Sequence, residues 1–232
     1  MKPISATGSF VDIQAAEQGP PDVRLAEREL IVVEGESAWK SVVAIRDASH
    51  QAVLAMQGKP INAAKASQAA VARNPWAAQF HRILTGRSNG PCSFDQNPNH
   101  DAAPYHRIVL LFDPDADGIH CEALMLLLVW HLAADWVDQQ RVWCVKAPAY
   151  EVQVQATGEV GYADHPLHLQ AIQRAAEKQG AILRSRPYRG LASIPAAVLR
   201  ARCVRPESRR QSCVTRDQIE AIRQTIGHRR PR

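Results

Sequence analysis

Asp113-Pro-Asp-Ala-Asp-Gly-Ile-His120 is the stretch that decides the fold and the candidate site. Three alternating carboxylates and a glycine directly follow the apolar run 107–112, which has the composition of a strand buried on both faces. Acids at the carboxyl end of such a strand face a ligand crevice. Because three carboxylates this close repel one another, a hard cation such as Mg2+ would stabilise them. The stretch therefore predicts a divalent-metal site.

Two other interpretations of the acidic stretch have to be considered. Its spacing matches the first half of an EF-hand calcium loop, but that loop needs a glutamate eleven residues after its first aspartate, where this sequence has Leu124. An EF-hand loop also follows a helix, whereas this stretch follows an expected strand. A solvated Asp-Gly turn that binds nothing is the other interpretation, and the residues of the stretch leave it open.

Strands alternate with helices along most of the chain. The hydrophobic patterns predict strands at 29–33, 52–56, 107–112, 141–145, 148–152 and 181–184. They predict helices at 38–46, with Ser37 as N-cap, and at 63–73, 75–84, 119–139, 167–179, 196–200 and 217–226. Residues 85–104 are expected to form an exposed excursion. The order predicts an α/β fold with a mostly parallel sheet covered by helices on both faces.

Glu34 lies at the carboxyl end of the first expected strand, and Asp113 lies at the carboxyl end of a later one. Because the carboxyl ends of parallel strands meet at one edge of a sheet, Glu34 is expected near the acidic stretch. Carboxylates in this arrangement can hold one or two Mg2+ ions, which stabilise attacking and leaving oxygens in phosphoryl transfer. A glutamate there could also donate or accept a proton.

The charge of the 232-residue chain is unevenly distributed. The formal net charge is +5 and the pI is about 9.1. From residue 184 to the end there are thirteen arginines and only three acids, which are Glu207, Asp217 and Glu220. Such a basic region is compatible with nucleic-acid binding and equally with an ordinary solvated surface.

The cysteines and the apolar segments indicate a cytoplasmic protein. No C-x-x-C pair occurs, which argues for reduced thiols and against a zinc site. The amino terminus lacks a signal-peptide core. The most apolar run, 123–134, is too short to span a bilayer, so a core helix and no membrane association are expected. The five scattered cysteines are Cys92, Cys121, Cys144, Cys203 and Cys213.

Two segments together resemble the TOPRIM domain, namely Glu34-Gly-Glu-Ser-Ala38 and the acidic stretch. The version that they resemble is found in the B subunits of the type IIA DNA topoisomerases gyrase and topoisomerase IV. Further segments resemble that family in family order, over about residues 28–215. They are Gln57-Gly-Lys-Pro-Ile-Asn62, Pro104-Tyr-His-Arg-Ile108, Val145-Lys-Ala-Pro-Ala-Tyr-Glu-Val152, Tyr188-Arg-Gly-Leu191 and Val204-Arg-Pro-Glu-Ser-Arg209.

The resemblance implies a Rossmann-like fold and a role for each acid. Glu34 would be the acid/base and a Mg2+ ligand, Asp113 and Asp115 would be ligands, and Asp117 a ligand or electrostatic support. Three further residues would face the cleaved DNA backbone, namely Lys59, Arg189 and His120. For His120, capping of the following helix is the alternative to a role in the site.

Several residues depart from the family pattern. The family usually has aspartate at Glu36, glycines at Trp39 and Lys40, and a basic residue at Gln57. Ala192-Ser-Ile194 replaces its Gly-Glu-Met segment. The metal carboxylates are kept while DNA-facing neighbours differ, so metal binding is better supported than full activity. The bulk of Trp39 beside the glycine turn puts the usual approach of DNA in doubt.

The resemblance also suggests how the chain is organised. Residues 1–27 would be a loose arm, 28–154 the TOPRIM domain, 155–215 a topoisomerase B-type extension and 216–232 a basic tail. No glycine-rich ATP motif is present. In the family, the tyrosine that attacks DNA belongs to the partner A subunit, and the tyrosines here fall at strand or loop positions of the domain.

Three functions are compatible with this sequence. The leading hypothesis is a Mg2+-dependent, topoisomerase-like (isomerase) module that binds DNA and assists strand cleavage and religation with a tyrosine-bearing A-type partner. The second is a DNA-binding or partner-binding paralogue without catalysis. The third is a TOPRIM nuclease that hydrolyses DNA or RNA without a partner.

Overall fold

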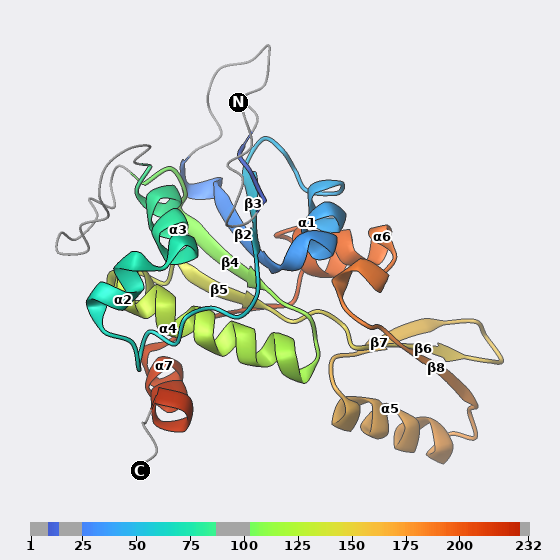
Figure 1. The fold of residues 1–232 in the computed structure, drawn as a ribbon. Helices are drawn as coiled ribbons and strands as arrows, with labels where there is room; N and C mark the ends of the chain where they lie inside the picture. Colours follow the sequence, from blue (N-terminus) through green and yellow to red (C-terminus); the bar gives the residue numbers. More distant parts are fainter. Residues whose placement is uncertain (1–8, 14–24, 87–102, 228–232) are drawn as a thin grey trace.

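The computed structural model describes residues 9–13, 25–86 and 103–227, and its centre is a six-stranded sheet in the order β1-β3-β2-β4-β5-β9 (Figure 1). The four central strands are parallel, and the two edge strands are antiparallel to their neighbours. The strands are β1 (Phe10–Val11), β2 (Glu29–Glu34), β3 (Gln51–Met56), β4 (Arg107–Leu111), β5 (Val142–Val145) and β9 (Gln211–Cys213). The mostly parallel α/β fold is confirmed.

Helices cover both faces of this sheet, as the continuous apolar strands predict. On β2, Leu30 and Val32 belong to one core, whereas Ile31 and Val33 belong to the other. The first core includes residues of α2 (Gln68–Arg73), α3 (Pro75–Thr85), α4 (Ala116–Asp138) and α7 (Arg216–Ile222). The second includes residues of α1 (Gly35–Val43), η3 (Leu191–Ser193), α6 (Ala196–Leu199) and the π-helix η4 (Arg200–Val204).

Helix α4 is longer than the apolar run inside it. Its 23 residues satisfy, by length and composition, the requirement for a helix that crosses a membrane, but 56% of its most apolar window is buried inside the protein. Met125, Leu128 and Val129 are fully buried in the first core. The interpretation of this segment as a core helix agrees with that packing.

A second, smaller sheet projects from the first (Figure 1). Its order is β7-β6-β8, all antiparallel, and helix α5 (Pro166–Lys178) packs against β7. The strands are β6 (Tyr150–Val154), β7 (Val160–Ala163) and β8 (Leu183–Pro187). Placing the expected strand 148–152 in the main sheet was therefore wrong, and the expected strand 181–184 pairs with it in the small sheet. Local sequence patterns predict that a segment is a strand, but its hydrogen-bonding partners decide which sheet it joins. The edge of the main sheet beside β5 is occupied by β9.

The amino-terminal arm is not loose where it is described. Residues Phe10 and Val11 pair with β3, and the Tyr105 hydroxyl donates a 2.5 Å hydrogen bond to Asp12 Oδ1. Arg46 Nη2 also donates to the Asp12 carbonyl at 3.0 Å. The expectation of a loose arm is wrong for residues 9–13, because these contacts fix the segment as an edge strand. The rest of residues 1–24 lies outside the described part of the chain.

Three helix boundaries differ from expectation. Helix α1 begins at Gly35 with Glu34 as its N-cap, so Ser37 is not the cap. Regular helix in the 63–73 region starts only at Gln68, where Ser67 accepts a hydrogen bond from Ala70 N. Helix α4 starts at Ala116, earlier than residue 119. The exposed excursion at 85–104 lies largely in residues 87–102, which are outside the described residues, as are 228–232 of the basic tail.

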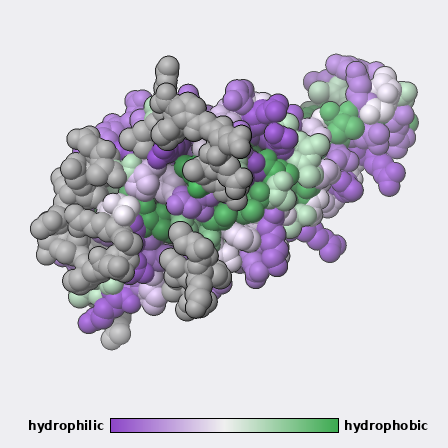
Figure 2. Space-filling model, turned by 90° about the horizontal axis from the view of Figure 1, so that it is seen from above, coloured by the Kyte–Doolittle hydropathy of each residue, from purple (hydrophilic) through white to green (hydrophobic). Residues whose placement is uncertain are grey.

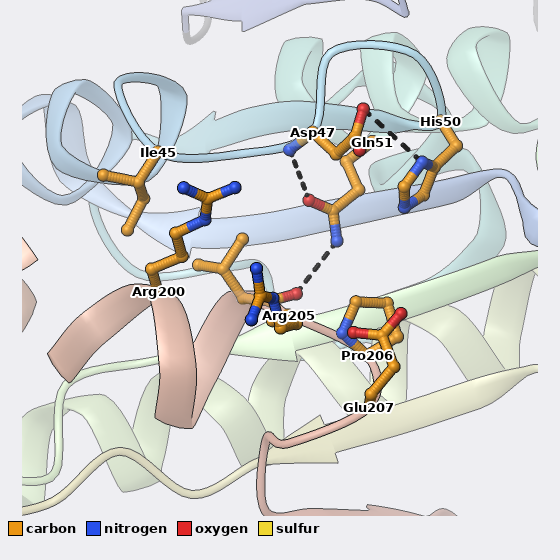
Figure 3. A pocket seen from close by; sticks show the side chains of 9 residues that line it. Ile45, Asp47, His50, Gln51, Arg200, Arg205, Pro206 and Glu207 are labelled. Atoms are coloured by element: carbon orange, nitrogen blue, oxygen red, sulfur yellow. Dashed lines mark hydrogen bonds and ion pairs between the residues drawn. The ribbon is translucent and has the colours of Figure 1, made fainter. Parts of the chain in front are cut away.

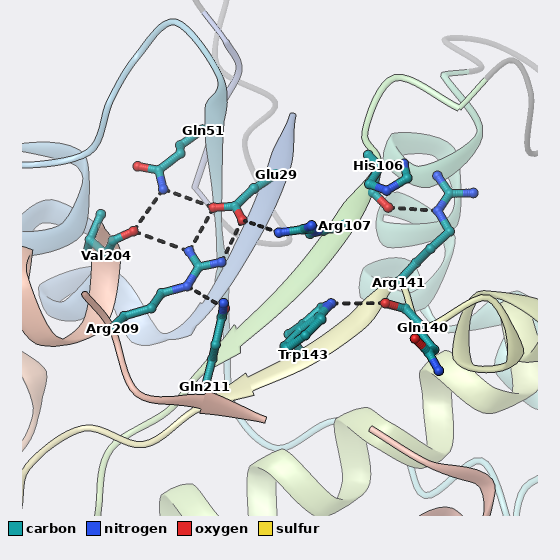
Figure 4. A network of polar contacts seen from close by, with 10 residues as sticks. All are labelled: Glu29, Gln51, His106, Arg107, Gln140, Arg141, Trp143, Val204, Arg209 and Gln211. Atoms are coloured by element: carbon teal, nitrogen blue, oxygen red, sulfur yellow. Dashed lines mark hydrogen bonds and ion pairs between the residues drawn. The ribbon is translucent and has the colours of Figure 1, made fainter. Parts of the chain in front are cut away.

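A buried ion pair fastens the carboxyl-terminal segment to the start of β2 (Figure 4). Arg209 Nη1 and Nη2 donate to the two oxygens of Glu29 at 2.7 and 2.6 Å, and both side chains are at most 2% exposed. Gln51 Nε2 donates to Glu29 Oε2 at 3.0 Å and to the Val204 carbonyl at 2.9 Å. The Pro-Glu-x-Arg segment thus has a structural role in this chain.

A shallow hollow lies beside this network, at the amino end of the strands (Figure 3). Its cations, Arg200 and Arg205, are matched by the carboxylates of Asp47 and Glu207. Every polar atom of the Gln51 side chain in its wall is bonded, since Oε1 accepts from Asp47 N. Balanced charge and satisfied polar groups give this hollow no preference for a charged ligand.

We expect Arg209→Ala to lower the free energy of unfolding by about 3 kcal/mol, because the buried Glu29 carboxylate would lose its two short hydrogen bonds and keep, among the described residues, only Gln51 and Arg107, 4.0 Å away, as partners. Urea denaturation followed by circular dichroism measures the loss. The matched control is Arg216→Ala, which breaks the exposed pair with Asp138 and should change stability little. Equal losses of unfolding free energy in the two variants would contradict the structural role assigned to the Glu29–Arg209 pair.

Candidate functional site

Two strand ends bring Glu34 and Asp113 to the same edge of the sheet. Strands β2 and β4 are parallel neighbours, with Val33 opposite Leu111, so the residues that follow them emerge together. Both carboxylates line one hollow, together with Arg189. The convergence of these three residues was predicted from the sequence. The rest of the wall consists of Gly35, Glu36, Ser37, Ala38, Gly190, Leu191, Ala192 and Ser193.

The Tyr-Arg-Gly-Leu loop holds the Asp113 carboxylate. Leu191 N donates to Asp113 Oδ1 at 2.8 Å, and Gly190 lies so close that a Cβ built there would be 2.6 Å from Asp113 Oδ2. Gly190 also has a φ of +127°, which side chains rarely adopt. Burial raises the pKa of Asp113, and the hydrogen bond from Leu191 opposes that shift. A half-buried carboxylate bonded to a distant loop is not a solvated turn.

Glu34 has one bonded and one unbonded oxygen. The buried thiol of Cys121 donates to Glu34 Oε1 at 3.5 Å, whereas Oε2 is buried without a partner. Burial raises the pKa of Glu34, the Cys121 hydrogen bond opposes this, and the nearby aspartates Asp113, Asp115 and Asp117 raise it further. The protein therefore holds Glu34 among acids, in surroundings that disfavour its negative charge.

Asp115 caps helix α4. Its Oδ1 accepts a hydrogen bond from Gly118 N at 2.8 Å. A Cβ on Gly118 would lie 2.1 Å from the Asp113 carbonyl oxygen, so only glycine allows the helix to start this close to the strand end. The glycine of the acidic stretch thus serves packing, and the calcium-loop interpretation is wrong because the stretch joins a strand to a helix.

Asp117 and Lys59 pair with each other. Lys59 Nζ lies 2.7 Å from Asp117 Oδ1, both side chains are exposed, and neither lines the hollow. The hydrogen bond from Lys59 lowers the pKa of Asp117. His120 is exposed within the first turns of α4. It does not cap that helix, because Asp115 does, so the capping alternative is wrong.

The acids fit a hard divalent cation. Among the described residues, no three His, Cys, Asp or Glu side chains lie close enough together to form a ready-made metal site. Glu34 nevertheless has a buried oxygen without a hydrogen-bond partner, and burial and the neighbouring carboxylates raise its pKa. A bound cation would supply the partner and offset the repulsion. The donors are all carboxylate oxygens, which suit Mg2+. The described cysteines, Cys121, Cys144, Cys203 and Cys213, are free thiols.

Two features of the site escaped the sequence analysis. Cys121 touches Glu34 from the second turn of α4, and only its position along the helix could have indicated this contact. Trp39 does not line the hollow, and its effect on the approach of DNA stays a prediction. Its indole Nε1 donates to the Val53 carbonyl at 3.2 Å, and its ring packs against the second core. The hydrogen bond to β3 turns the ring away from the glycine turn.

We expect Gly190→Ala to destabilise the protein by about 3 kcal/mol, because the added methyl group meets the Asp113 carboxylate in a strained backbone conformation. The control is Gly180→Ala, whose φ is +67° but whose Cβ would meet nothing within 4 Å. It should cost about 1 kcal/mol from the backbone alone. Urea denaturation compares the two, and similar losses would argue against a close contact at Asp113.

The pKa shifts predict how metal-free stability depends on pH. Because burial raises the pKa of Glu34 above 4.5 and that of Asp113 above 3.8, the folded state keeps protons that the unfolded state releases. Stability should therefore fall as pH rises from about those values through the raised pKa values. Thermal melting in EDTA should show a shallower fall for Glu34→Gln, whereas Glu177→Gln on α5 should match wild type. A steeper fall in Glu34→Gln would contradict the prediction.

Comparison with known proteins identifies the family. The Toprim domain model matches residues 29–146, which contain strands β2 to β5 and both Glu34 and Asp113. The DNA gyrase B protein of Metamycoplasma hominis is 32% identical over 184 residues, or 79% of this chain and 27% of the relative. That of Thermus thermophilus is 30% identical over 185 residues, or 79% and 28%. That of Mycolicibacterium smegmatis is 31% identical over 200 residues, or 84% and 29%.

The chain spans less than a third of the length of these relatives. The family match covers half of the chain and follows the strands that carry the site. The chain therefore belongs to the Toprim domain family and is related to the B subunits of type IIA DNA topoisomerases.

Proposed function

We propose that this chain is a Mg2+-dependent module that assists DNA strand cleavage and religation together with a partner subunit that supplies a tyrosine. The observation that carries the proposal is the hollow where Glu34, Asp113 and Arg189 meet, in a chain related to gyrase B. Glu34 and Asp113 beside a guanidinium suit a phosphodiester, since a cation between acids and phosphate, and an arginine beside it, both offset negative charge. Glu36, the third carboxylate of the wall, is paired with Lys40 at 2.9 Å.

Glu34, Asp113 and Asp115 are the residues that would hold Mg2+, with Asp117 as electrostatic support. The ion, when bound, would polarise the scissile phosphate and stabilise charge on the leaving oxygen. Glu34 would hold or release a proton at Oε2, the oxygen that has no partner. Its raised pKa brings that proton closer to neutral pH, where general acid/base groups work best. Arg189, exposed at the rim, would bind a phosphate oxygen.

The attacking group would come from another chain. The Tyr105 hydroxyl is committed to Asp12, and the Tyr188 hydroxyl donates to Glu151 Oε2 at 2.6 Å. Burial raises the pKa of Tyr188 to about 12, which disfavours the phenolate. No tyrosine lines the hollow as the structure describes it. An A-type subunit of a type IIA topoisomerase fits this requirement, and DNA and a cytoplasmic location follow from the same proposal.

The test is DNA cleavage by the chain reconstituted with an A-type subunit and supercoiled plasmid. Glu34→Gln and Asp113→Asn should each reduce Mg2+-dependent cleavage by about 100-fold or more, because each removes charge or proton transfer at the reacting phosphate. Asp113→Asn should also abolish the rise in melting temperature on adding Mn2+. Glu177→Gln, an exposed acid on α5, is the matched control.

Unchanged cleavage in both site variants would refute the assignment of the site. Nicking by the purified chain with Mn2+ alone would favour a nuclease over a partner-dependent module. DNA binding without cleavage under any reconstitution would favour the paralogue without catalysis, whose affinity would survive loss of the carboxylates.

A further inference from the structure

The small sheet has one covered face and one open face. Directly opposed residues of antiparallel strands share a face, so the register assigns Val152, Ala163 and Ser185 to one side. Val152 and Ala163 are buried, and α5 packs along β7 on that side (Figure 1). We call the other side the open face. Its strand residues are Glu151, Gln153, Val160, Tyr162, Arg184 and Arg186.

The open face is basic. Arg184, Arg186 and Gln153 are exposed, and Glu151 is the one acid that the described strands place on this face. That acid is already engaged, since it accepts a hydrogen bond from the Tyr188 hydroxyl at 2.6 Å and lies 3.6 Å from Arg186 Nη2. Figure 2, seen from the side opposite α5, shows a mainly hydrophilic surface on this projecting part. The face therefore carries net positive charge.

Aromatic rings lie beside the arginines. Arg202 of η4 stacks over the Tyr162 ring at 4.3 Å, and Arg186 lies 5.5 Å from the centroid of Tyr188. Stacked guanidinium groups keep their N–H donors at the ring edge, available to an anion. Tyr188 is buried and Tyr162 packs against the second core, so these rings support the guanidinium groups, and the exposed arginines of the face are the groups available to phosphate oxygens.

The open face continues into the candidate site. Strand β8 carries Arg184 and Arg186 and ends at Pro187. Tyr188 follows, and the next residues, Arg189 and Gly190, line the hollow that holds Asp113. Residues two apart on a strand are about 6.8 Å apart. The arginines therefore form a row that leads away from the carboxylates at a spacing comparable to that of neighbouring phosphates along one DNA strand.

We propose that the open face binds the backbone of the DNA strand that flanks the phosphodiester in the hollow. The inference rests on the proposed function for its ligand, and it adds a second contact surface remote from the metal ligands. Charge complementarity and continuity with the hollow favour DNA as the occupant. An acidic protein is the competing occupant that the experiment must exclude.

The experiment measures DNA affinity of the full chain in EDTA by fluorescence anisotropy, with a labelled 30-base-pair duplex and its single strand, over 50–200 mM NaCl. Arg184→Ala/Arg186→Ala should weaken binding about tenfold and reduce the slope of log Kd against log salt by about two. Glu151→Gln should tighten binding two- to threefold, since it removes the acid and releases Arg186. The two variants alter the same face but should change DNA affinity in opposite directions, and misfolding would not produce tighter binding.

The matched control is Arg174→Ala/Lys178→Ala, which removes the same charge from exposed positions on α5, behind the sheet. It should leave affinity and salt slope near wild type. Equal losses in both double variants would overturn the proposal, because binding would then follow net charge only. Displacement of DNA by polyglutamate at equal charge concentration would also overturn it, in favour of an acidic protein.

The outcome separates this inference from the proposed function. Binding in EDTA needs neither metal nor partner, so loss of affinity in the open-face variant supports the surface even if Glu34→Gln leaves cleavage unchanged. Normal affinity in that variant overturns the surface even if Glu34→Gln abolishes cleavage. Wild-type chain that binds no DNA overturns the open-face proposal, whereas the proposed function, which includes a partner subunit, is decided by the cleavage test.

Discussion

The contact between Asp113 and the Gly190–Leu191 backbone is the constraint on which the candidate site depends. It joins the end of a central strand to a loop 78 residues further along the chain. Because the glycine backbone approaches the carboxylate closely, the small sheet, the loop and the main sheet are fixed relative to one another at this point. The hollow exists because the loop closes over the strand ends.

A second constraint is the repulsion among four neighbouring acids. Each acid has its own hydrogen-bond donor: Leu191 N for Asp113, the Cys121 thiol for Glu34, Gly118 N for Asp115 and Lys59 for Asp117. These hydrogen bonds offset part of the repulsion, so that the protein can fold with the four carboxylates near one another. They also leave Glu34 Oε2 as the buried carboxylate oxygen without a partner, which distinguishes it from the other acids.

The sequence was most informative where local pattern and position in a strand decide the structure. Apolar runs predicted the parallel strands, and strand ends predicted the meeting of Glu34 and Asp113, whereas only the family resemblance connected Arg189 with the site. The sequence was least informative where contacts between separate segments of the chain decide the structure. No local signal says that β6 joins β7 and β8, that Phe10 pairs with β3, or that the Trp39 ring turns toward Val53. Likewise, only the folded helix brings the Cys121 thiol to Glu34.

The ion pair between Glu29 and Arg209 has a consequence for biosynthesis. Its two residues lie 180 positions apart, at the start of the strand that ends in Glu34 and near the end of the carboxyl-terminal segment. The ribosome must therefore release nearly the whole domain before Glu29 finds its partner. Until then Glu29 has, among the described residues, only the amide of Gln51 and the guanidinium of Arg107, 4.0 Å away, as polar partners of its side chain, and it lacks its two short hydrogen bonds from Arg209. The strand bearing the candidate acid/base should be among the last parts of the domain to become fixed as the chain is synthesised.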